Sequence, residues 1–125
     1  MIFGKSKKIR AYELGKSGED AALEYLRREK YKVAARGFRF LRGEIDVIAW
    51  DGPTLVFIEV KTRKLSPFGY PEESVNPAKR SQIRRVARGY LLRNTLDAVE
   101  CRFDVLTLTV DELTGWSINH IKNAF

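Results

Sequence analysis

The sequence is poor in residues that support thiol or imidazole chemistry. Among its 125 residues there is one cysteine, Cys101, and one histidine, His120. A single cysteine cannot form an internal disulfide, which suits a reducing compartment. Cys101 lies in an apolar segment, where we expect it to pack as a small hydrophobic side chain. The composition therefore excludes a disulfide scaffold and a zinc cluster of His and Cys ligands.

Long apolar runs are also absent. No segment approaches the roughly 18 apolar residues of a membrane-spanning helix. The first ten residues, MIFGKSKKIR, contain too short an apolar run for a signal peptide. There is no internal repeat and no low-complexity segment. We therefore expect a cytoplasmic protein without membrane contact, with a flexible basic N-terminus over residues 1–10 and a single domain over residues 11–125.

Positive charge, by contrast, is abundant. The chain carries 23 Lys and Arg residues against 16 Asp and Glu residues, a formal net charge of +7. A basic surface attracts polyanions, with nucleic acid as the leading candidate and an anionic membrane surface as the second. Excess charge can also serve solubility alone. Charge by itself therefore leaves a binding role and a solvating role open.

The hydrophobic pattern predicts a compact α/β domain around a mixed sheet, in the order helix, three strands, helix, two strands. Asn76 is a suitable N-cap for the second helix, and Pro77 suits its first position. A loop with two prolines and a glycine precedes that helix over residues 65–76. The predicted elements are a helix over 11–30, strands over 32–40, 44–50 and 55–61, a helix from residue 77, and strands over 102–110 and 116–121.

Four charged residues interrupt two segments that otherwise read as buried strands, in RGEIDVIAWDGPTLVFIEVKTR (residues 42–63). If residues 52–53 form a two-residue loop, Asp46 lies opposite Glu59 and Glu44 lies opposite Lys61. Side chains alternate along a strand, so all four are expected on one face unless a bulge intervenes. Both segments are apolar on both faces, which predicts a sheet covered on both sides.

Two carboxylates in opposed positions repel, and folding alone gives no reason to choose them. A divalent cation removes the conflict, because Mg²⁺ and Mn²⁺ prefer carboxylate and water oxygens. Lys61 would then steady a leaving phosphate or orient an attacking water, which together describe a phosphodiesterase site. The alternative is an ion-pair network without catalytic function, in which Arg42 and Arg63 help to offset the acidic charge.

The stretch resembles the PD-(D/E)xK motif of restriction-endonuclease-like nucleases. The matching residues are Asp46 and then Glu59-Val60-Lys61, while Ile45 stands where that motif usually has proline. The resemblance implies a restriction-endonuclease-like core, α-β-β-β-α-β(-β), with a mixed central sheet flanked by helices.

A closer likeness covers nearly the whole chain. The blocks GKSGEDAALEYLRREKYKV, RGEIDVIAWDG, LVFIEVKTR, FGYPEESVNPAKRSQIRRVARGYL and RFDVL resemble the YraN-like family of small bacterial proteins. Gly37 stands where members of that family usually carry asparagine. The family is similar to archaeal Holliday junction resolvases, so the resemblance implies nuclease ancestry without naming a substrate.

The resemblance implies further site residues. Glu19, in GKSGED, matches a helix glutamate that reaches the metal in resolvase-like relatives, with Gly18 allowing close approach of helix and sheet; the alternative is a surface glutamate. Glu44 assists the metal or pairs with Lys61, and Asp104 is expected to be structural. Phe68 and Tyr70 are expected to be buried rather than stacked on a base, and Gln82 matches a nuclease glutamine only loosely. We expect nucleic-acid contacts from five basic residues: Arg63, Lys64, Lys79, Arg80 and Arg84.

The leading hypothesis is a Mg²⁺- or Mn²⁺-dependent nuclease acting on branched or otherwise structured DNA. Its catalytic residues are Asp46, Glu59 and Lys61, and its metal ligands are Asp46 and Glu59 with Glu19 and Glu44 as further candidates. DNA is preferred to RNA as the partner, and a resolvase activity would require a homodimer. The alternative is a nucleic-acid-binding module that has the fold but no robust turnover. A third possibility is an adaptor in a larger complex, which predicts an exposed apolar patch.

Overall fold

The computed structural model describes residues 11–64, 75–111 and 115–125 of the chain. The predicted N-terminal segment 1–10, and the loop with Phe68 and Tyr70, lie outside these residues. The order of elements is the one expected from the sequence: α1 (Ala11–Arg28), β1 (Lys32–Phe40), β2 (Gly43–Asp51), β3 (Thr54–Lys64), α2 (Pro77–Arg93), β4 (Cys101–Asp111) and β5 (Gly115–Ile121).

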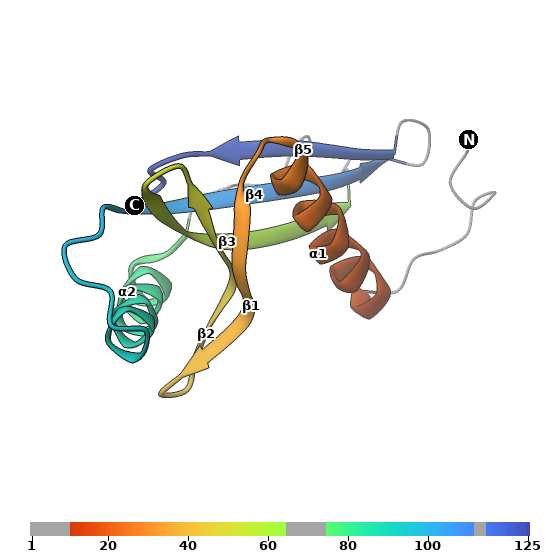
Figure 1. Ribbon diagram of the computed structural model, residues 1–125. Coiled ribbons are helices and arrows are strands. Elements are labelled where there is room, and N and C mark those ends of the chain that lie inside the picture. The colour runs from red at the N-terminus through yellow and green to blue at the C-terminus, as the bar shows by residue number, and fades with distance from the viewer. Residues whose placement is uncertain (1–10, 65–74, 112–114) are drawn as a thin grey trace.

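The five strands form one sheet in the order β1-β2-β3-β4-β5. Strands β3 and β4 are parallel, and the other three neighbouring pairs are antiparallel. Parallel neighbours need a crossover connection, and α2 lies in the connection between β3 and β4. Figure 1 shows that β1 and β2 run steeply across the direction of β4 and β5, so the sheet is strongly twisted. The mixed sheet of the expected fold is therefore present.

Each face of the sheet is covered by one helix, as the apolar character of both faces predicts. On one face, Ala22, Leu23 and Leu26 of α1 are buried against a cluster that includes Val47, Ala49, Val56, Ile58, Leu106 and Leu108. On the other, Ile83, Val86 and Ala87 of α2 are buried with Ile45, Ile48, Leu55, Phe57 and Val105. Figure 1 shows the two helices on opposite sides of the sheet. These two cores fix where each helix presents its polar residues.

Glycine allows both helices to approach the strands closely. A Cβ atom added to Gly18 of α1 would lie 2.1 Å from Oγ1 of Thr62 on β3. One added to Gly89 of α2 would lie 2.5 Å from Cδ2 of Phe40 on β1. Real Cβ contacts are never this short, so any side chain at either position would displace its helix. The close helix–sheet approach expected at Gly18 is therefore confirmed.

The helix ends follow local chemistry. The side chain of Asn76 caps α2 as predicted, because its Oδ1 accepts a hydrogen bond from the N–H of Lys79 at 2.9 Å. Helix α1 ends at Arg28, two residues before the predicted end, because Lys30 adopts a left-handed φ of 69°. The N–H of Tyr31 then donates to the carbonyl of Leu26 at 2.9 Å. Within the described ranges, neither helix is long and apolar enough to cross a membrane.

Candidate functional site

The site begins where strands β2 and β3 diverge. Their pairing runs from Asp51 and Thr54 to Val47 and Ile58, in the register that a two-residue loop predicts. Beyond that point β3 continues along β4 and β2 continues along β1. The expected cross-strand pairs of Asp46 with Glu59 and of Glu44 with Lys61 are therefore not part of the ladder. We call the opening between the strands, with the carboxylates of Asp46 and Glu59, the carboxylate fork.

Asp46 occupies the opening itself. Its Oδ2 accepts a hydrogen bond from the backbone N–H of Val60 at 2.8 Å, so the carboxylate takes the place of a strand carbonyl. Strand alternation breaks here, because Val47 packs in the core under α1 and Ile45 in the core under α2. Gly37, opposite this point on β1, has a φ of 62°. The expectation that strict alternation puts all four charges on one face is thus too simple.

The carboxyl groups of Asp46 and Glu59 nevertheless meet, and their side chains are within hydrogen-bonding reach of one another. Burial, followed by the negative charge of Glu59, raises the pKa of Asp46 to about 7, while the bond from Val60 opposes the shift. Asp46 is therefore partly protonated near neutral pH. The surroundings of Asp46 therefore disfavour its charged form.

Two further glutamates approach the fork. Glu19 of α1 is half-buried, and burial together with the charge of Asp46 raises its pKa, against the opposing effect of Arg36. Glu44 contributes to both raised pKa values, and its Oε2 lies 3.6 Å from Nε of Arg39 on β1. Glu19 is thus electrostatically linked to the fork, where the resemblance places it. Glu44 has an ion-pair partner on β1.

The donor set fits a divalent cation that keeps part of its water shell. Within the described part of the chain, no three His, Cys, Asp or Glu side chains are arranged to hold a metal ion as one group. Asp46 and Glu59 therefore offer two carboxylates, the number with which Mg²⁺ is commonly bound. Nζ of Lys79 lies 3.7 Å from Oε2 of Glu59, which is ion-pair distance.

Lys61 lies on the same face as Glu59. The two residues are two positions apart on β3, whose pairing with β4 is regular from Leu55 to Lys64. The residue paired with Lys61 is Thr107, whose hydroxyl is buried and has no hydrogen-bond partner among the described residues. A buried hydroxyl normally has a partner, so a polar group or a water is expected beside the hydroxyl of Thr107.

Of the five residues expected to contact nucleic acid, the three on α2 make different contacts. On α2, Arg80 donates from Nε to the carbonyl of Val75 at 2.7 Å, and the guanidinium of Arg84 lies over the ring of Phe103 at 5.7 Å. Lys79 instead points to the fork through Glu59. Arg63 is exposed, and the side chain of Lys64 lies outside the described residues. The cations of α2 are therefore divided between two sides of the helix.

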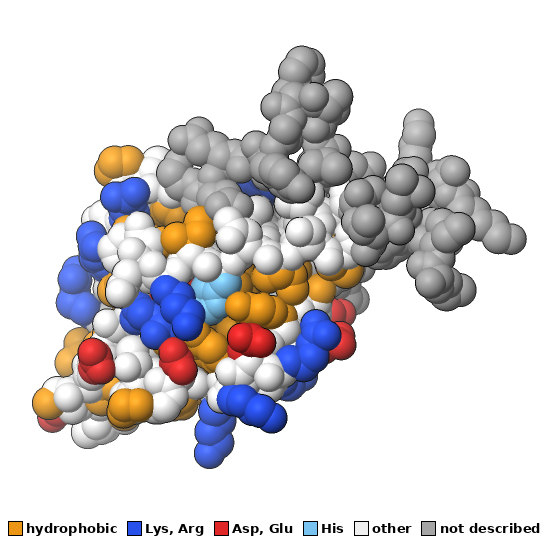
Figure 2. Space-filling view, turned by 90° about the horizontal axis from the view of Figure 1, so that it is seen from above, with side chains coloured by type: hydrophobic (Ala, Val, Ile, Leu, Met, Phe, Trp, Pro, Cys, Tyr) orange, Lys and Arg blue, Asp and Glu red, His pale blue; other side chains and the backbone are white. Residues whose placement is uncertain are grey.

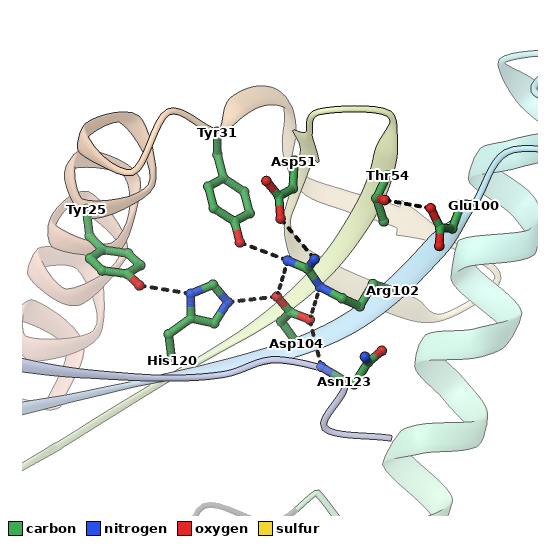
Figure 3. Close-up of polar contacts among 9 residues, drawn as sticks. All are labelled: Tyr25, Tyr31, Asp51, Thr54, Glu100, Arg102, Asp104, His120 and Asn123. Atoms are coloured by element: carbon green, nitrogen blue, oxygen red, sulfur yellow. Dashed lines mark hydrogen bonds and ion pairs between the residues drawn. The ribbon is translucent and has the colours of Figure 1, made fainter.

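A second group of charges, which sequence reasoning missed, surrounds Asp104 (Figure 3). This side chain is fully buried and accepts from Nε of Arg102 at 2.9 Å, Nη2 of Arg102 at 3.0 Å and the N–H of Asn123 at 3.1 Å. Its Oδ2 also lies 2.7 Å from Nε2 of His120. We call this group, with the tyrosines and Asp51 that extend it, the Asp104 network. It connects β4 to β5 and to the C-terminal residues.

The network reaches α1 and β2 through its outer members. Nη1 and Nη2 of Arg102 donate to Asp51 at 2.9 Å and to the hydroxyl of Tyr31 at 2.8 Å, and Nδ1 of His120 lies 2.9 Å from the hydroxyl of Tyr25. Hydrogen bonds from His120 and Arg102 outweigh burial and lower the pKa of Asp104. In Figure 2, acidic and basic side chains gather around a histidine ring and apolar side chains on one face. The arrangement accounts for Asp104 as a structural residue, as expected.

Comparison with known proteins identifies close relatives of this chain. The model of the uncharacterised protein family UPF0102 matches residues 18–108. A UPF0102 protein of Geobacter sulfurreducens is 45% identical over 112 residues, covering 90% of this chain and 88% of the relative. Another, from Chlorobaculum tepidum, is 46% identical over 117 residues, covering 90% of this chain and 91% of the relative. The region that the family model matches contains the carboxylate fork, all of α2 and α1 from Gly18 onward.

Proposed function

Because the chain belongs to the uncharacterised protein family UPF0102, whose name carries no activity, we propose its function from the site: a metal-dependent nuclease that hydrolyses phosphodiester bonds in DNA. The observation that carries this proposal is the meeting of Asp46 and Glu59 where β2 and β3 diverge. The fold alone gives no reason to bring two carboxyl groups together in a half-buried opening.

In this proposal Asp46 and Glu59 hold Mg²⁺ or Mn²⁺, with Glu19 and Glu44 adding negative charge around it. When bound, the metal lowers the pKa of a water and offsets charge that develops on the phosphate. The bond from Val60 fixes one oxygen of Asp46, so the carboxylate is oriented before a ligand arrives. Lys61, on the face of Glu59, positions the attacking water or the leaving phosphate.

The basic body of the protein supplies the affinity for DNA in this proposal. Lys79, which lies at the fork, and exposed Arg63, two residues beyond Lys61 on β3, are the cations that we expect to contact the DNA backbone. Contacts to phosphates carry no sequence information, so binding is expected to be weakly dependent on sequence and strongly dependent on salt. Affinity that does not change between low and moderate salt would contradict this part of the proposal.

The test is cleavage of plain and branched DNA with Mg²⁺ or Mn²⁺ by the wild-type protein, Asp46→Asn and Lys61→Ala. Lys61→Ala is expected to fold, to bind DNA and to cleave at least ~10²-fold more slowly, the scale of losing one positioned electrostatic group. Lys32→Ala, which truncates an exposed lysine at the start of β1, is the matched control. Cleavage that persists in Asp46→Asn would refute the assignment of the site.

A nucleic-acid-binding module without turnover is the second candidate. It is favoured by the ion pair between Glu59 and Lys79, which already offsets part of the acidic charge without a metal. Wild-type protein that binds DNA with a steep salt dependence, yet cleaves no DNA form with either metal, would decide for this alternative.

A further inference from the structure

The turn between β1 and β2 presents an exposed apolar side chain at a position where such a residue is unfavourable. Phe40 and Gly43 are paired, so Leu41 and Arg42 form a two-residue turn. Both have positive φ, 43° for Leu41 and 63° for Arg42. Turns of this kind prefer Asn and Gly, because a bulky side chain is strained in the left-handed region. Leu41 is nevertheless 65% exposed, so neither the turn nor the core accounts for it.

The turn is held rigidly on α2. Nη2 of Arg85 donates to the carbonyl of Leu41 at 3.1 Å. Immediately after the turn, a Cβ atom on Gly43 would lie 2.4 Å from Cγ2 of Val86, which shows how closely the backbone touches the helix. Before the turn, Phe40 packs on Gly89. The tip therefore projects its leucine from a fixed base, and strain that is held in place in this way is typical of functional loops.

The same turn forms one wall of a positively charged groove. The groove has a volume of about 670 Å³ and is lined by Arg39, Leu41, Arg42, Glu44, Lys79 and Arg93 among others. Four of these side chains are cationic and one is acidic. Lys79 connects the groove to the carboxylate fork, since it lies 3.7 Å from Glu59. A polyanion that follows the groove would thus be led to the fork with Leu41 against it.

We propose that Leu41 is a wedge that inserts between bases of a nucleic acid bound in this groove, and that it selects duplexes whose base stacking is interrupted. The inference rests on the proposed function, whose substrate class it narrows. Proteins that kink DNA insert apolar side chains between base steps while cations hold the backbone. Unstacking costs least where pairing or stacking is already broken, so a wedge favours branch points, nicks and mismatches.

The experiment compares two DNAs of equal length and shared sequence, a continuous duplex and a three-way branch, by fluorescence anisotropy with the full chain. Chelator removes divalent cations, so no cleavage occurs. Leu41→Asn deletes the apolar wedge and suits the left-handed turn, so its melting temperature should not fall. The matched control is Leu92→Asn, which removes the other large, strongly exposed hydrophobic side chain of the described residues, at the end of α2.

The wild type and Leu92→Asn are expected to prefer the branch roughly tenfold or more, the scale of one base-stacking contact. Leu41→Asn should bind the continuous duplex within about twofold of the wild type and lose the preference. A 2-aminopurine base beside the branch should brighten with the wild type and not with Leu41→Asn. If Leu41→Asn keeps both the preference and the fluorescence change, or if the wild type shows no preference, the wedge is refuted.

The proposed function is judged separately, by salt-dependent binding of the continuous duplex and by metal-dependent cleavage. If the results refute the wedge while salt-dependent binding and metal-dependent cleavage are intact, only the inference about Leu41 is wrong. If the protein binds no nucleic acid under any condition, both the proposed function and the inference about Leu41 are refuted. The exposed Leu41 is then assigned to a surface that contacts another protein.

Discussion

Asp46 is half-buried and Asp104 is fully buried on the same sheet, and their surroundings shift the pKa values of the two carboxyl groups in opposite directions. Asp104 is fully buried and accepts four hydrogen bonds or ion-pair contacts, two of them from one arginine, and its pKa is lowered. Asp46 accepts one backbone hydrogen bond, faces Glu59, and has a pKa raised to about 7. One carboxylate is neutralised by its fold and the other is not.

The comparison separates structural charge from functional charge by a physical criterion. A buried ion that is fully paired contributes to holding elements together, and removing one partner is costly. A buried acid with an acidic neighbour destabilises the fold unless something from outside offsets it. Perturbed carboxyl groups of the second kind gather at functional sites. Three experiments on single side chains test this distinction.

The largest effect is expected from Asp104→Asn. The change removes the negative charge that pairs with Arg102 and His120 in the buried network, so the free energy of unfolding should fall by about 3 kcal/mol or more. Denaturant unfolding at neutral pH provides the measurement. The control is Asp51→Asn, at the half-exposed end of the same network, which should cost less than ~1 kcal/mol. Equal losses in the two variants would show that burial is not what distinguishes Asp104.

Asp46→Asn is expected to raise the free energy of unfolding, the opposite of the effect of Asp104→Asn. Asparagine keeps an acceptor for the N–H of Val60 and removes the charge that repels Glu59. Without metal, the variant should be more stable than the wild type by about 1–3 kcal/mol at pH 8. The advantage should vanish near pH 4. If the fold stabilised the charged carboxylate of Asp46, Asp46→Asn would be less stable than the wild type at pH 8, which would contradict this prediction.

The sign of this pH dependence follows from linkage. Because the pKa of Asp46 is raised in the folded state, its favourable contribution is complete below its ordinary value of 3.8 and is lost as the pH rises through about 7. The pKa of Asp104 is lowered, so its contribution is present above 3.8 and is lost on further acidification. The two residues therefore give the wild-type protein stability changes of opposite slope in different pH ranges.

The smallest effects should come from neighbours of Asp46. Glu59→Gln removes the largest charge contribution to its raised pKa and should lower that pKa by roughly one unit. Glu44→Gln removes a weaker contribution and should lower it by less. Titration of the Asp46 carboxyl carbon by NMR measures both. A larger shift in Glu44→Gln than in Glu59→Gln would contradict the placement of the two glutamates.

The sequence predicts much of this fold because the informative signals are local. The hairpin register follows from the two-residue loop at 52–53, and Asn76 marks the start of α2 through its own side chain. The fork could not be predicted in this way. Where β3 leaves β2 depends on its ten pairs with β4, which is far along the chain. The alternation of side chains along one strand does not show where that strand separates from its neighbour.

The Asp104 network was missed although a signal for it was present. Arg102 and Asp104 alternate within an otherwise apolar strand, which is the same feature that drew attention to Glu59 and Lys61. Their partners, His120, Tyr25 and Tyr31, lie on other elements and leave no pattern in the sequence. A lone histidine excludes a zinc cluster, but it does not exclude a buried network of hydrogen bonds.

The most direct test of the distinction is calorimetric titration of Mn²⁺ into the wild type, Asp46→Asn and Asp51→Asn at pH 7, in two buffers of different ionisation enthalpy. We expect the wild type and Asp51→Asn to bind the ion with release of a proton, because a metal ligand must be deprotonated. Asp46→Asn should bind at least ~10-fold more weakly, with little proton release. Equal affinity and no proton release in all three proteins would contradict the assignment of Asp46 as a metal ligand.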